Sequence, residues 1–220
     1  MRNIILIIAE TIICYTSMLF LYKKFKTDGL YVYGIIATFM ACIMSLKQID
    51  LMSINVPTGF GVTTSLIIAS HIITQKRNPQ EIKTYLILII ITALTSCCFL
   101  NLSGLVESSQ YNEYANKAYD SIFKYNLRIY FALIISLVST IFLSTKLYYL
   151  LKKLQNKIIV SNVFSIIIIE LLENILFVFI AYLFIQEPIN LILCIIFRYM
   201  IKTVIGLIGT IPIFISTKIS

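Results

Sequence analysis

Four charged side chains stand in apolar stretches near the C-terminal end of the sequence. Glu170 and Glu173 lie in the run IIIIELLENILF, and Arg198 and Lys202 lie in the next apolar run. A charge at the centre of a membrane helix costs roughly 2.5–3.5 kcal/mol. Residues three or four apart share one helix face, so the two acids would face the two bases. This arrangement predicts either a substrate path, for which intramembrane charges are typical, or an ion-pair staple between two helices.

The spacing of the two runs predicts which charges meet. The short turn QEPIN makes the runs an antiparallel hairpin. Counted from Glu187, Glu173 lies fourteen residues along one arm and Lys202 lies fifteen along the other. At about 1.5 Å per residue, these two side chains are expected at nearly the same depth, with Arg198 nearer the turn.

Neutral polar groups accompany the charges. Asn162, Ser165 and Asn174 lie on the same predicted helix as the glutamates. Acids, bases and amides together suit a polar, uncharged, planar heterocycle. The single histidine, His71, ends another apolar run just before Gln75. It is expected either at the membrane interface, within reach by snorkelling, or on a substrate or proton pathway.

No metal site and no enzyme are predicted. The histidine has no companion ligands, and the five cysteines lie in apolar runs without metal or disulfide spacing, so we interpret them as packing residues. The sequence contains no GxSxG, HExxH, P-loop or CxxC motif. No cofactor is therefore expected.

The elements that position these residues are predicted to be membrane helices. The chain has 220 residues, of which 59% are hydrophobic and 13% are charged; a soluble domain is about a quarter charged. Lipid-facing backbone must satisfy its own hydrogen bonds, and strand alternation is absent, so helices are expected. We predict an all-α polytopic protein of about seven spans in one domain over 1–220. The spans are expected at 3–22, 30–49, 56–75, 84–104, 128–151, 160–185 and 188–216.

The charged linkers predict the orientation. Lysine and arginine gather after the first, third and fifth segments, at Lys23, Lys24, Lys26, Lys76, Arg77, Lys83, Lys152, Lys153 and Lys157. This positive-inside pattern places the N-terminus outside and the C-terminus inside. It also accounts for the net charge of +8 without nucleic acid. The first segment is interpreted as a retained helix, and the linker 104–126 as either a short helix on the outer membrane face or a loop.

Several stretches together resemble the queuosine precursor transporters, a vitamin-uptake-transporter-like family of bacterial inner-membrane proteins. The likeness covers FLYKKFKTDGLYVYGIIATF, VPTGFGVTTSLIIASHIITQKRNPQEI, AYDSIFKYNLRIYFALIISLVST, SNVFSIIIIELLENILFVFIAY and YMIKTVIGLIGTIPIF. The residues that match the family are Lys47, Gly59, Arg128, Asn162, Ser165, Phe177 and Lys202. The resemblance implies a seven-helix fold similar to vitamin-binding components of bacterial uptake systems.

Other polar positions depart from the family. The chain has His71 and Gln75 where the family usually has an aspartate and a glutamate, and Phe60 where it has an asparagine. Its Cys42 and Met44 replace an asparagine and a glutamine, and Glu170 and Glu173 replace a glutamine and an aspartate. The scaffold is therefore expected to be retained while the substrate-contacting set has changed.

The leading hypothesis is a multi-pass inner-membrane transporter that imports queuine or a pre-queuosine base. The alternatives are a substrate-capture component for another vitamin-like heterocycle and a structural membrane protein without transport. ATP-driven uptake would need an energising partner, since the chain has no nucleotide-binding motif; the sequence leaves such a partner and a homo-oligomer open. The candidate substrate-binding residues are Glu170, Glu173, Asn162, Ser165, Lys202, Arg198, Arg128, His71 and Gln75.

Overall fold

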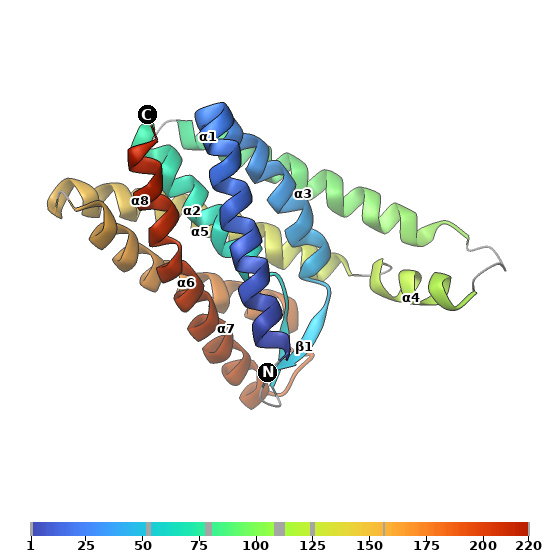
Figure 1. The fold of residues 1–220 in the computed structure, drawn as a ribbon. Helices are drawn as coiled ribbons and strands as arrows, with labels where there is room; N and C mark the ends of the chain where they lie inside the picture. The colour runs from blue at the N-terminus through green and yellow to red at the C-terminus, as the bar shows by residue number, and fades with distance from the viewer. Residues whose placement is uncertain are drawn as a thin grey trace.

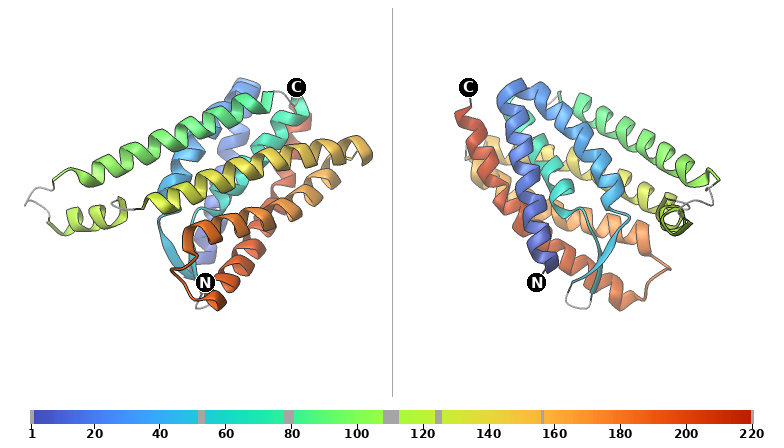
Figure 2. Two further views of the ribbon diagram at one scale, coloured as in Figure 1. Left: turned by 180° about the vertical axis from the view of Figure 1, so that it is seen from behind. Right: turned by 45° about the vertical axis from the view of Figure 1, so that its right-hand side comes forward.

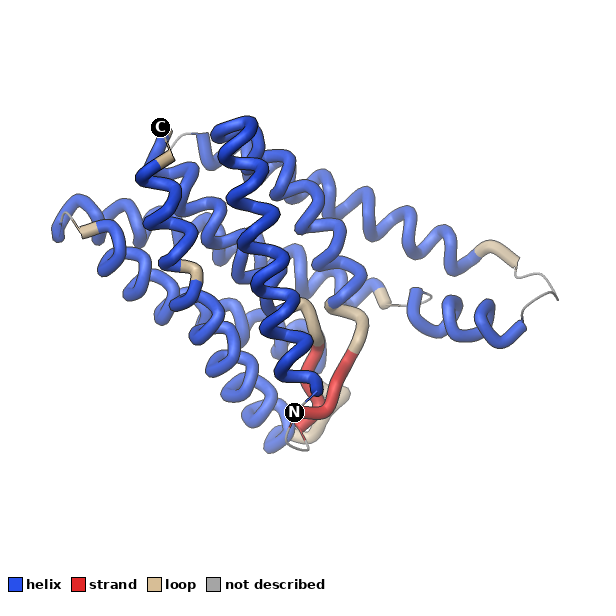
Figure 3. The backbone as a smooth tube through the Cα atoms, in the orientation of Figure 1, coloured by secondary structure: helices blue, strands red, loops and turns tan. Residues whose placement is uncertain are grey.

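The chain folds into a bundle of long helices with one small hairpin of strands (Figures 1 and 3). The computed structural model describes residues 2–51, 54–77, 81–107, 113–123, 126–155 and 157–219. Its elements are α1 (Arg2–Met44), β1 (Gln48–Leu51), β2 (Ile54–Pro57), α2 (Phe60–Lys76), α3 (Ile82–Leu105), α4 (Glu113–Phe123), α5 (Leu127–Gln155), α6 (Ile158–Tyr182), α7 (Pro188–Ile208) and α8 (Thr210–Lys218). Among these residues, five helical stretches are long and apolar enough to cross a membrane: α1, α3, α5, α6 and α7 with α8. The protein is therefore a helical membrane protein.

Helix α1 consists of two helices joined by a sharp turn. Lys26 has φ 54° and ψ −139°, which no helix accommodates. The two arms return side by side (Figures 1 and 2). A Cβ on Gly29 would lie 2.2 Å from the carbonyl oxygen of Leu21, so only glycine permits so tight a return. The arms correspond to the predicted segments 3–22 and 30–49.

A short antiparallel hairpin lies between two of the predicted helical segments, 30–49 and 56–75, and shortens both. The second predicted segment ends early, at Met44, and β1 pairs with β2 from Gln48 opposite Pro57. Each strand has four residues, far fewer than the ten-residue strands of a membrane barrel. Pro57 has no backbone N–H to donate to a neighbouring strand. Gly59, at φ 87°, then turns the chain into α2.

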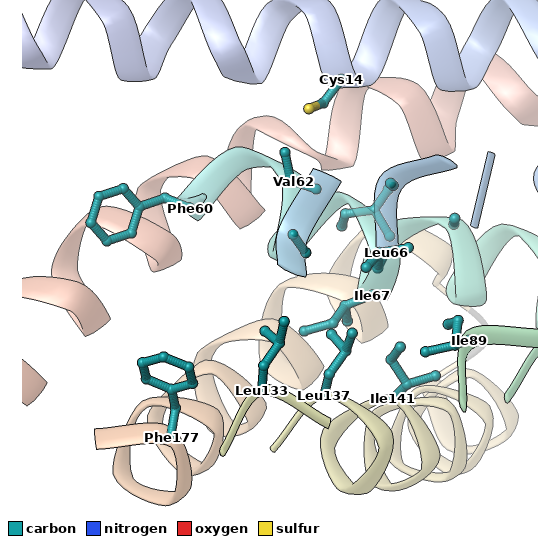
Figure 4. Packing of buried hydrophobic residues seen from close by; sticks show 14 of the residues in the cluster. Cys14, Phe60, Val62, Leu66, Ile67, Ile89, Leu133, Leu137, Ile141 and Phe177 are labelled. Carbon is teal, nitrogen blue, oxygen red and sulfur yellow. The ribbon is translucent and has the colours of Figure 1, made fainter. Parts of the chain in front are cut away.

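Helix α2 occupies the centre of the bundle. It has 17 residues, and all of them from Phe60 to Thr74 are buried. Its Ile67 points toward Leu133 and Leu137 of α5 (Figure 4). The helix is shorter and more polar than the long apolar helices around it. Its hydroxyl groups can be buried because several of them donate hydrogen bonds to backbone carbonyls one turn earlier. These hydroxyls belong to Thr63, Ser65, Ser70 and Thr74.

The last predicted segment, 188–216, is interrupted at Gly209, which separates α7 from α8. The Tyr15 hydroxyl donates to the Ile205 carbonyl at 2.8 Å, and the Gly209 N–H donates to the same oxygen at 3.0 Å. Pro212 has no N–H to continue the helical ladder. A Cβ on Gly209 would lie 2.7 Å from the Tyr15 hydroxyl. The break is thus set by close packing of α1 against glycine.

The long linker contains a helix, α4, as one of its two interpretations predicted. Helix α4 lies beside the far end of α3 and projects from the bundle (Figure 2). The Tyr119 hydroxyl bonds to the Ser103 hydroxyl at 2.7 Å, which ties α4 to α3. Residues 108–112 and 124–125 of this linker lie outside the described residues. That α4 rests on the outer membrane face stays a prediction.

The turns gather at two ends of the bundle. At one end Arg77 pairs with Asp28 at 3.3 Å, and Lys76 donates to the Ile219 carbonyl at 3.4 Å. These contacts join the turn of α1, the α2–α3 turn and the C-terminus. At the other end, Asn3 donates to the Asp50 carbonyl at 3.2 Å. Two of the three linkers predicted on the cytoplasmic side therefore meet at one end, beside the C-terminal residues; that this end faces the cytoplasm stays a prediction.

Candidate functional site

The four predicted charges meet in one buried cluster. Lys202 Nζ of α7 lies 2.7 Å from Glu173 Oε2 and 3.2 Å from Glu170 Oε2, both on α6. Arg198 Nη2 reaches Glu173 Oε2 at 3.6 Å. The side chains of Glu170, Glu173 and Lys202 have no exposed surface, and that of Arg198 is 4% exposed. The sequence prediction that Glu173 faces Lys202 is confirmed. We call these four residues, with Thr64 and Asn174, the charged cluster.

The guanidinium of Arg198 is held on several sides. Its Nε donates to Asn174 Oδ1 at 2.9 Å. Its Cζ lies 4.5 Å from the centre of the Phe177 ring and 5.7 Å from that of Phe60. These two aromatic side chains come from α6 and from the start of α2 (Figure 4). Contacts of a cation with aromatic faces stabilise it where water is excluded, so Arg198 is fixed in place while Lys202 bridges the acids.

Two carboxylate oxygens in the charged cluster accept no hydrogen bond. Thr64 of α2 donates to Glu170 Oε1 at 2.8 Å, and Lys202 donates to Glu173 Oε2. Glu173 Oε1 has no hydrogen-bond partner, and neither has Glu170 Oε2. Lys202 Nζ lies 3.2 Å from Glu170 Oε2 and forms an ion pair with it. Buried acceptors are normally paired, so Glu173 Oε1 has capacity for a further donor, whereas Glu170 Oε2 is held in its ion pair with Lys202.

A second, neutral cluster surrounds His71. Its Nδ1 lies 2.6 Å from Asn162 Oδ1 of α6, and its Nε2 lies 2.5 Å from Ser144 Oγ of α5. The imidazole stacks on the Tyr148 ring with centroids 4.5 Å apart and planes at 10°. Ser165 donates to the Ser144 carbonyl at 3.2 Å. We call these five residues the histidine cluster. The expectation that His71 reaches the interface is wrong, because its side chain is completely buried.

The structure thus divides the predicted substrate-binding set. Glu170, Glu173, Arg198 and Lys202 belong to the charged cluster, and Asn162, Ser165 and His71 belong to the histidine cluster. Asn162 precedes Glu170 by eight residues, which is about 12 Å along α6. Gln75 follows His71 by one turn of α2 and is half-buried, with Oε1 unpartnered.

Arg128 lies apart from both clusters. It is exposed, and it donates from Nε to the Ile180 carbonyl and from Nη2 to the Leu183 carbonyl, each at 2.6 Å. Carbonyls at the end of a helix lack partners within the helix and carry partial negative charge. Arg128 therefore caps the end of α6 and ties it to the start of α5.

Sequence reasoning missed three contributors to these clusters. Thr64, which binds Glu170, lies in the polar run that contains His71, but spacing along α2 alone does not reveal which helix it faces. Ser144 and Tyr148 on α5 are four apart and share a face, yet serine and tyrosine in an apolar run are common packing residues. Only the position of α5 against α2 and α6 brings them to the imidazole.

Another carboxylate, Glu10, is used differently. Its Oε1 accepts a hydrogen bond of 3.1 Å from the backbone N–H of Val62 in the first turn of α2. The first N–H groups of a helix have no partners within the helix, and this end favours negative charge. A Cβ on Gly61 would lie 3.1 Å from the Thr11 backbone, so glycine lets α1 approach closely enough for this bond.

Two cavities open between the helices. One of about 450 Å³ lies between the arms of α1 beside Glu10, and one of about 670 Å³ lies between α1 and α7. Their walls are mostly apolar, and neither is lined by a member of the charged cluster or the histidine cluster. Among the described residues, no group of three or more His, Cys, Asp and Glu side chains gathers as a metal site would require.

Long apolar helices around buried, paired charges define a class of protein: helical membrane proteins with a polar interior, of which transporters are typical. Residues 57–216 match the family model described as "Putative vitamin uptake transporter". This match covers well over half of the chain, and the protein belongs to this family of uptake transporters. No curated protein and no solved structure matches the chain.

Proposed function

We propose that this protein imports a queuosine precursor, queuine or a pre-queuosine base, across the bacterial inner membrane, and that the charged cluster binds it. The observation that carries the proposal is the pair of buried carboxylates, of which Glu173 Oε1 has no partner and Glu170 Oε2 meets only the Lys202 ammonium. The family supplies the class of activity, and the resemblance noted in the sequence supplies the substrate.

The chemistry of the cluster suits a planar heterocycle that presents N–H groups. A carboxylate accepts hydrogen bonds at two oxygens, and each charge-assisted bond contributes about 1.5–3 kcal/mol. Arg198 and Asn174 add donors for carbonyl or ring-nitrogen acceptors, and the rings of Phe60 and Phe177 supply apolar walls. An ion-pair cluster that only joins α6 to α7 would not leave Glu173 Oε1 without a partner, because such an atom destabilises the fold.

Glutamine variants test whether the cluster binds substrate. In Glu170→Gln and Glu173→Gln, the size is kept but the charge is lost and two donors are added. The apparent affinity for the imported base should fall about ten- to a hundredfold, since about 1.4 kcal/mol corresponds to one decade. The measurement is uptake of labelled queuine and pre-queuosine bases by cells without their own transporter, normalised to membrane-inserted protein.

Glu10→Gln is the matched control. It also removes a carboxylate, but one that is half-buried and binds the start of α2 instead of the charged cluster. Its uptake per inserted molecule should remain near that of the parent protein. Unchanged normalised uptake in both cluster variants would leave Glu170 and Glu173 with a structural role. Uptake that depends on an added ATP-hydrolysing partner would instead indicate a substrate-capture component.

We further propose seven spans, with the N-terminus outside and the C-terminus inside. The lysine and arginine asymmetry supports this orientation, as does the contact of the α2–α3 turn with the C-terminus at one end of the bundle. Reporter fusions after Lys26, Arg77 and Lys157 should all report the cytoplasm. A periplasmic signal at any two of these positions would contradict the orientation.

A further inference from the structure

The hydrogen bonds of His71 allow it to take up a proton without losing a partner. Asn162 Oδ1 only accepts, so Nδ1 of the ring carries a hydrogen in either charge state. Ser144 Oγ is a hydroxyl, which donates to Nε2 of the neutral ring and accepts from Nε2–H of the charged ring. When it accepts, the hydroxyl hydrogen is free to turn toward Ser165 Oγ at 3.4 Å. No heavy atom has to move.

The surroundings of His71 contain few competing charges. The ring in direct contact is the neutral Tyr148. Several titratable side chains on the elements packed against α2 are engaged elsewhere. They are Glu10 with Val62, Tyr15 with Ile205, Tyr33 with Ser65, Tyr85 with Leu66, Lys146 over Phe142, Lys218 over Phe214, and Arg198 and Lys202 in the charged cluster. The groups that contact the ring, Asn162, Ser144 and Tyr148, are neutral, and a proton on His71 would place a charge among them.

The histidine cluster and the charged cluster connect the same two helices. Helix α2 carries His71 and Thr64, and α6 carries their respective partners, Asn162 and Glu170. The two hydrogen bonds lie seven residues apart on α2 and eight apart on α6, about 11–12 Å in both cases. Any sliding or tilting of α6 relative to α2 changes both bonds together. A ligand that alters the Thr64–Glu170 bond and a proton on His71 would therefore both affect the position of α6 relative to α2. Two binding events are coupled when both shift the same conformational equilibrium.

From these contacts we infer that His71 is the proton-binding site through which uptake is driven by the proton gradient. The inference rests on the proposed function and supplies its coupling ion. A proton from the outer side binds Nε2 and converts the imidazole to an imidazolium, with the substrate bound at the charged cluster. After the movement of α6, the same proton leaves toward the end of α2 at Lys76, which is predicted to face the cytoplasm. The ring returns to its neutral form. Each round of protonation and deprotonation of His71 thus carries one proton across the membrane.

Reconstituted protein separates proton movement from substrate movement. In lightly buffered proteoliposomes, addition of queuine or a pre-queuosine base should alkalinise the outer medium as protons enter with it. In His71→Gln, the amide can still donate toward Asn162 and accept from Ser144. This variant should exchange labelled for unlabelled base, yet lose the alkalinisation and accumulate the base at least about tenfold less under an imposed gradient. Ser70→Ala is the matched control, since its hydroxyl bonds only to Ile67 within α2.

A second measurement does not depend on the substrate. The chain has a single histidine, so protein labelled with nitrogen-15 histidine and purified without a histidine tag gives ring signals from His71 alone. On acidification, the two ring nitrogens should change from unequal to equivalent protonated shifts. Ser144→Ala should alter this transition, because it removes the partner of Nε2.

The possible outcomes distinguish the two proposals. Failure to transport any queuosine precursor, together with a titrating ring, overturns the proposed function and leaves the proton site standing. Gradient-driven accumulation that persists in His71→Gln overturns the proton site even if transport is confirmed. If His71→Gln does not insert, the ring titration of the parent protein decides, and a ring that stays neutral down to about pH 4 refutes the inference.

Discussion

The charged cluster and the histidine cluster share helices α2 and α6 but are stabilised in opposite ways. In the charged cluster, Lys202 lies between two carboxylates, and each group depends on the charge of its neighbour. In the histidine cluster, every member is neutral when the ring is neutral, and the contacts are hydrogen bonds and one ring stack. The first arrangement is therefore sensitive to the loss of any single charge, and the second to the loss of a particular hydrogen-bond partner.

This difference also bears on what each region can bind. Fixed charges with an unpartnered carboxylate oxygen, Glu173 Oε1, suit a ligand that brings donors. Neutral groups that can reverse the direction of their hydrogen bonds suit a proton. In the histidine cluster, Asn162 Nδ2 and the Tyr148 hydroxyl also lack partners, so its polar capacity exceeds the bonds that it makes. A set of variants that weakens one cluster and spares the other tests whether the two tasks are separate.

The largest effect is expected from Lys202→Met. This change leaves Glu170 with only the hydroxyl of Thr64, while Glu173 keeps the nearby guanidinium of Arg198. Removing one partner of a buried ion pair typically costs about 3–5 kcal/mol, because a charge is left without compensation. The stability of the purified protein in detergent, followed by circular dichroism during unfolding, should fall by this amount.

Two double variants show which carboxylate is left without a cation in Lys202→Met. Glu170→Gln with Lys202→Met removes the carboxylate that has no other cation, so it should recover most of the lost stability. Glu173→Gln with Lys202→Met should recover less, because Glu170 stays charged and unpaired. Equal recovery in both, or recovery in neither, would show that Lys202 does not serve the two carboxylates as their distances indicate.

The charged cluster could be predicted from the sequence because charges in apolar runs stand out. The three- and four-residue spacings fix one face on each helix, and the five-residue turn QEPIN fixes the relative depth of Glu173 and Lys202. The contact at 2.7 Å confirms this estimate. No comparable signal marks Thr64 as the partner of Glu170, since it depends on how α2 lies against α6.

The histidine cluster could not be assembled from the sequence for a related reason. Its members come from three helices whose order around the bundle is set by tertiary packing, and serine or asparagine in an apolar helix has no single meaning. The fold shows the same limit. Apolar length predicted the long helices, whereas the strands Gln48–Leu51 and Ile54–Pro57 and the break at Gly209 depend on contacts with residues far away in the chain.

An intermediate effect is expected from Ser144→Ala. The change leaves Nε2 of a completely buried imidazole without its partner at 2.5 Å. A buried polar group left unsatisfied costs about 1–3 kcal/mol, so the free energy of unfolding should fall by that amount, less than for Lys202→Met. Ser136→Ala on the same helix is the control, since its buried hydroxyl bonds to the Leu133 carbonyl within α5. A loss in Ser144→Ala no greater than in Ser136→Ala would argue against the bond to His71.

The smallest effect is expected from Tyr148→Phe, which separates the two parts of the tyrosine. The Tyr148 ring stacks on His71, while its hydroxyl is buried without a hydrogen-bond partner. Phenylalanine keeps the stack and removes a hydroxyl whose burial is unfavourable, so stability should stay within about 0.5 kcal/mol of the parent or rise slightly. Tyr148→Leu, in contrast, should lose about 0.5–1.5 kcal/mol beyond the change in buried area, because the ring pair is broken. The same unfolding measurement compares the two variants. A loss in Tyr148→Phe as large as in Tyr148→Leu would mean that the hydroxyl, and not the ring, is what holds Tyr148 in the histidine cluster.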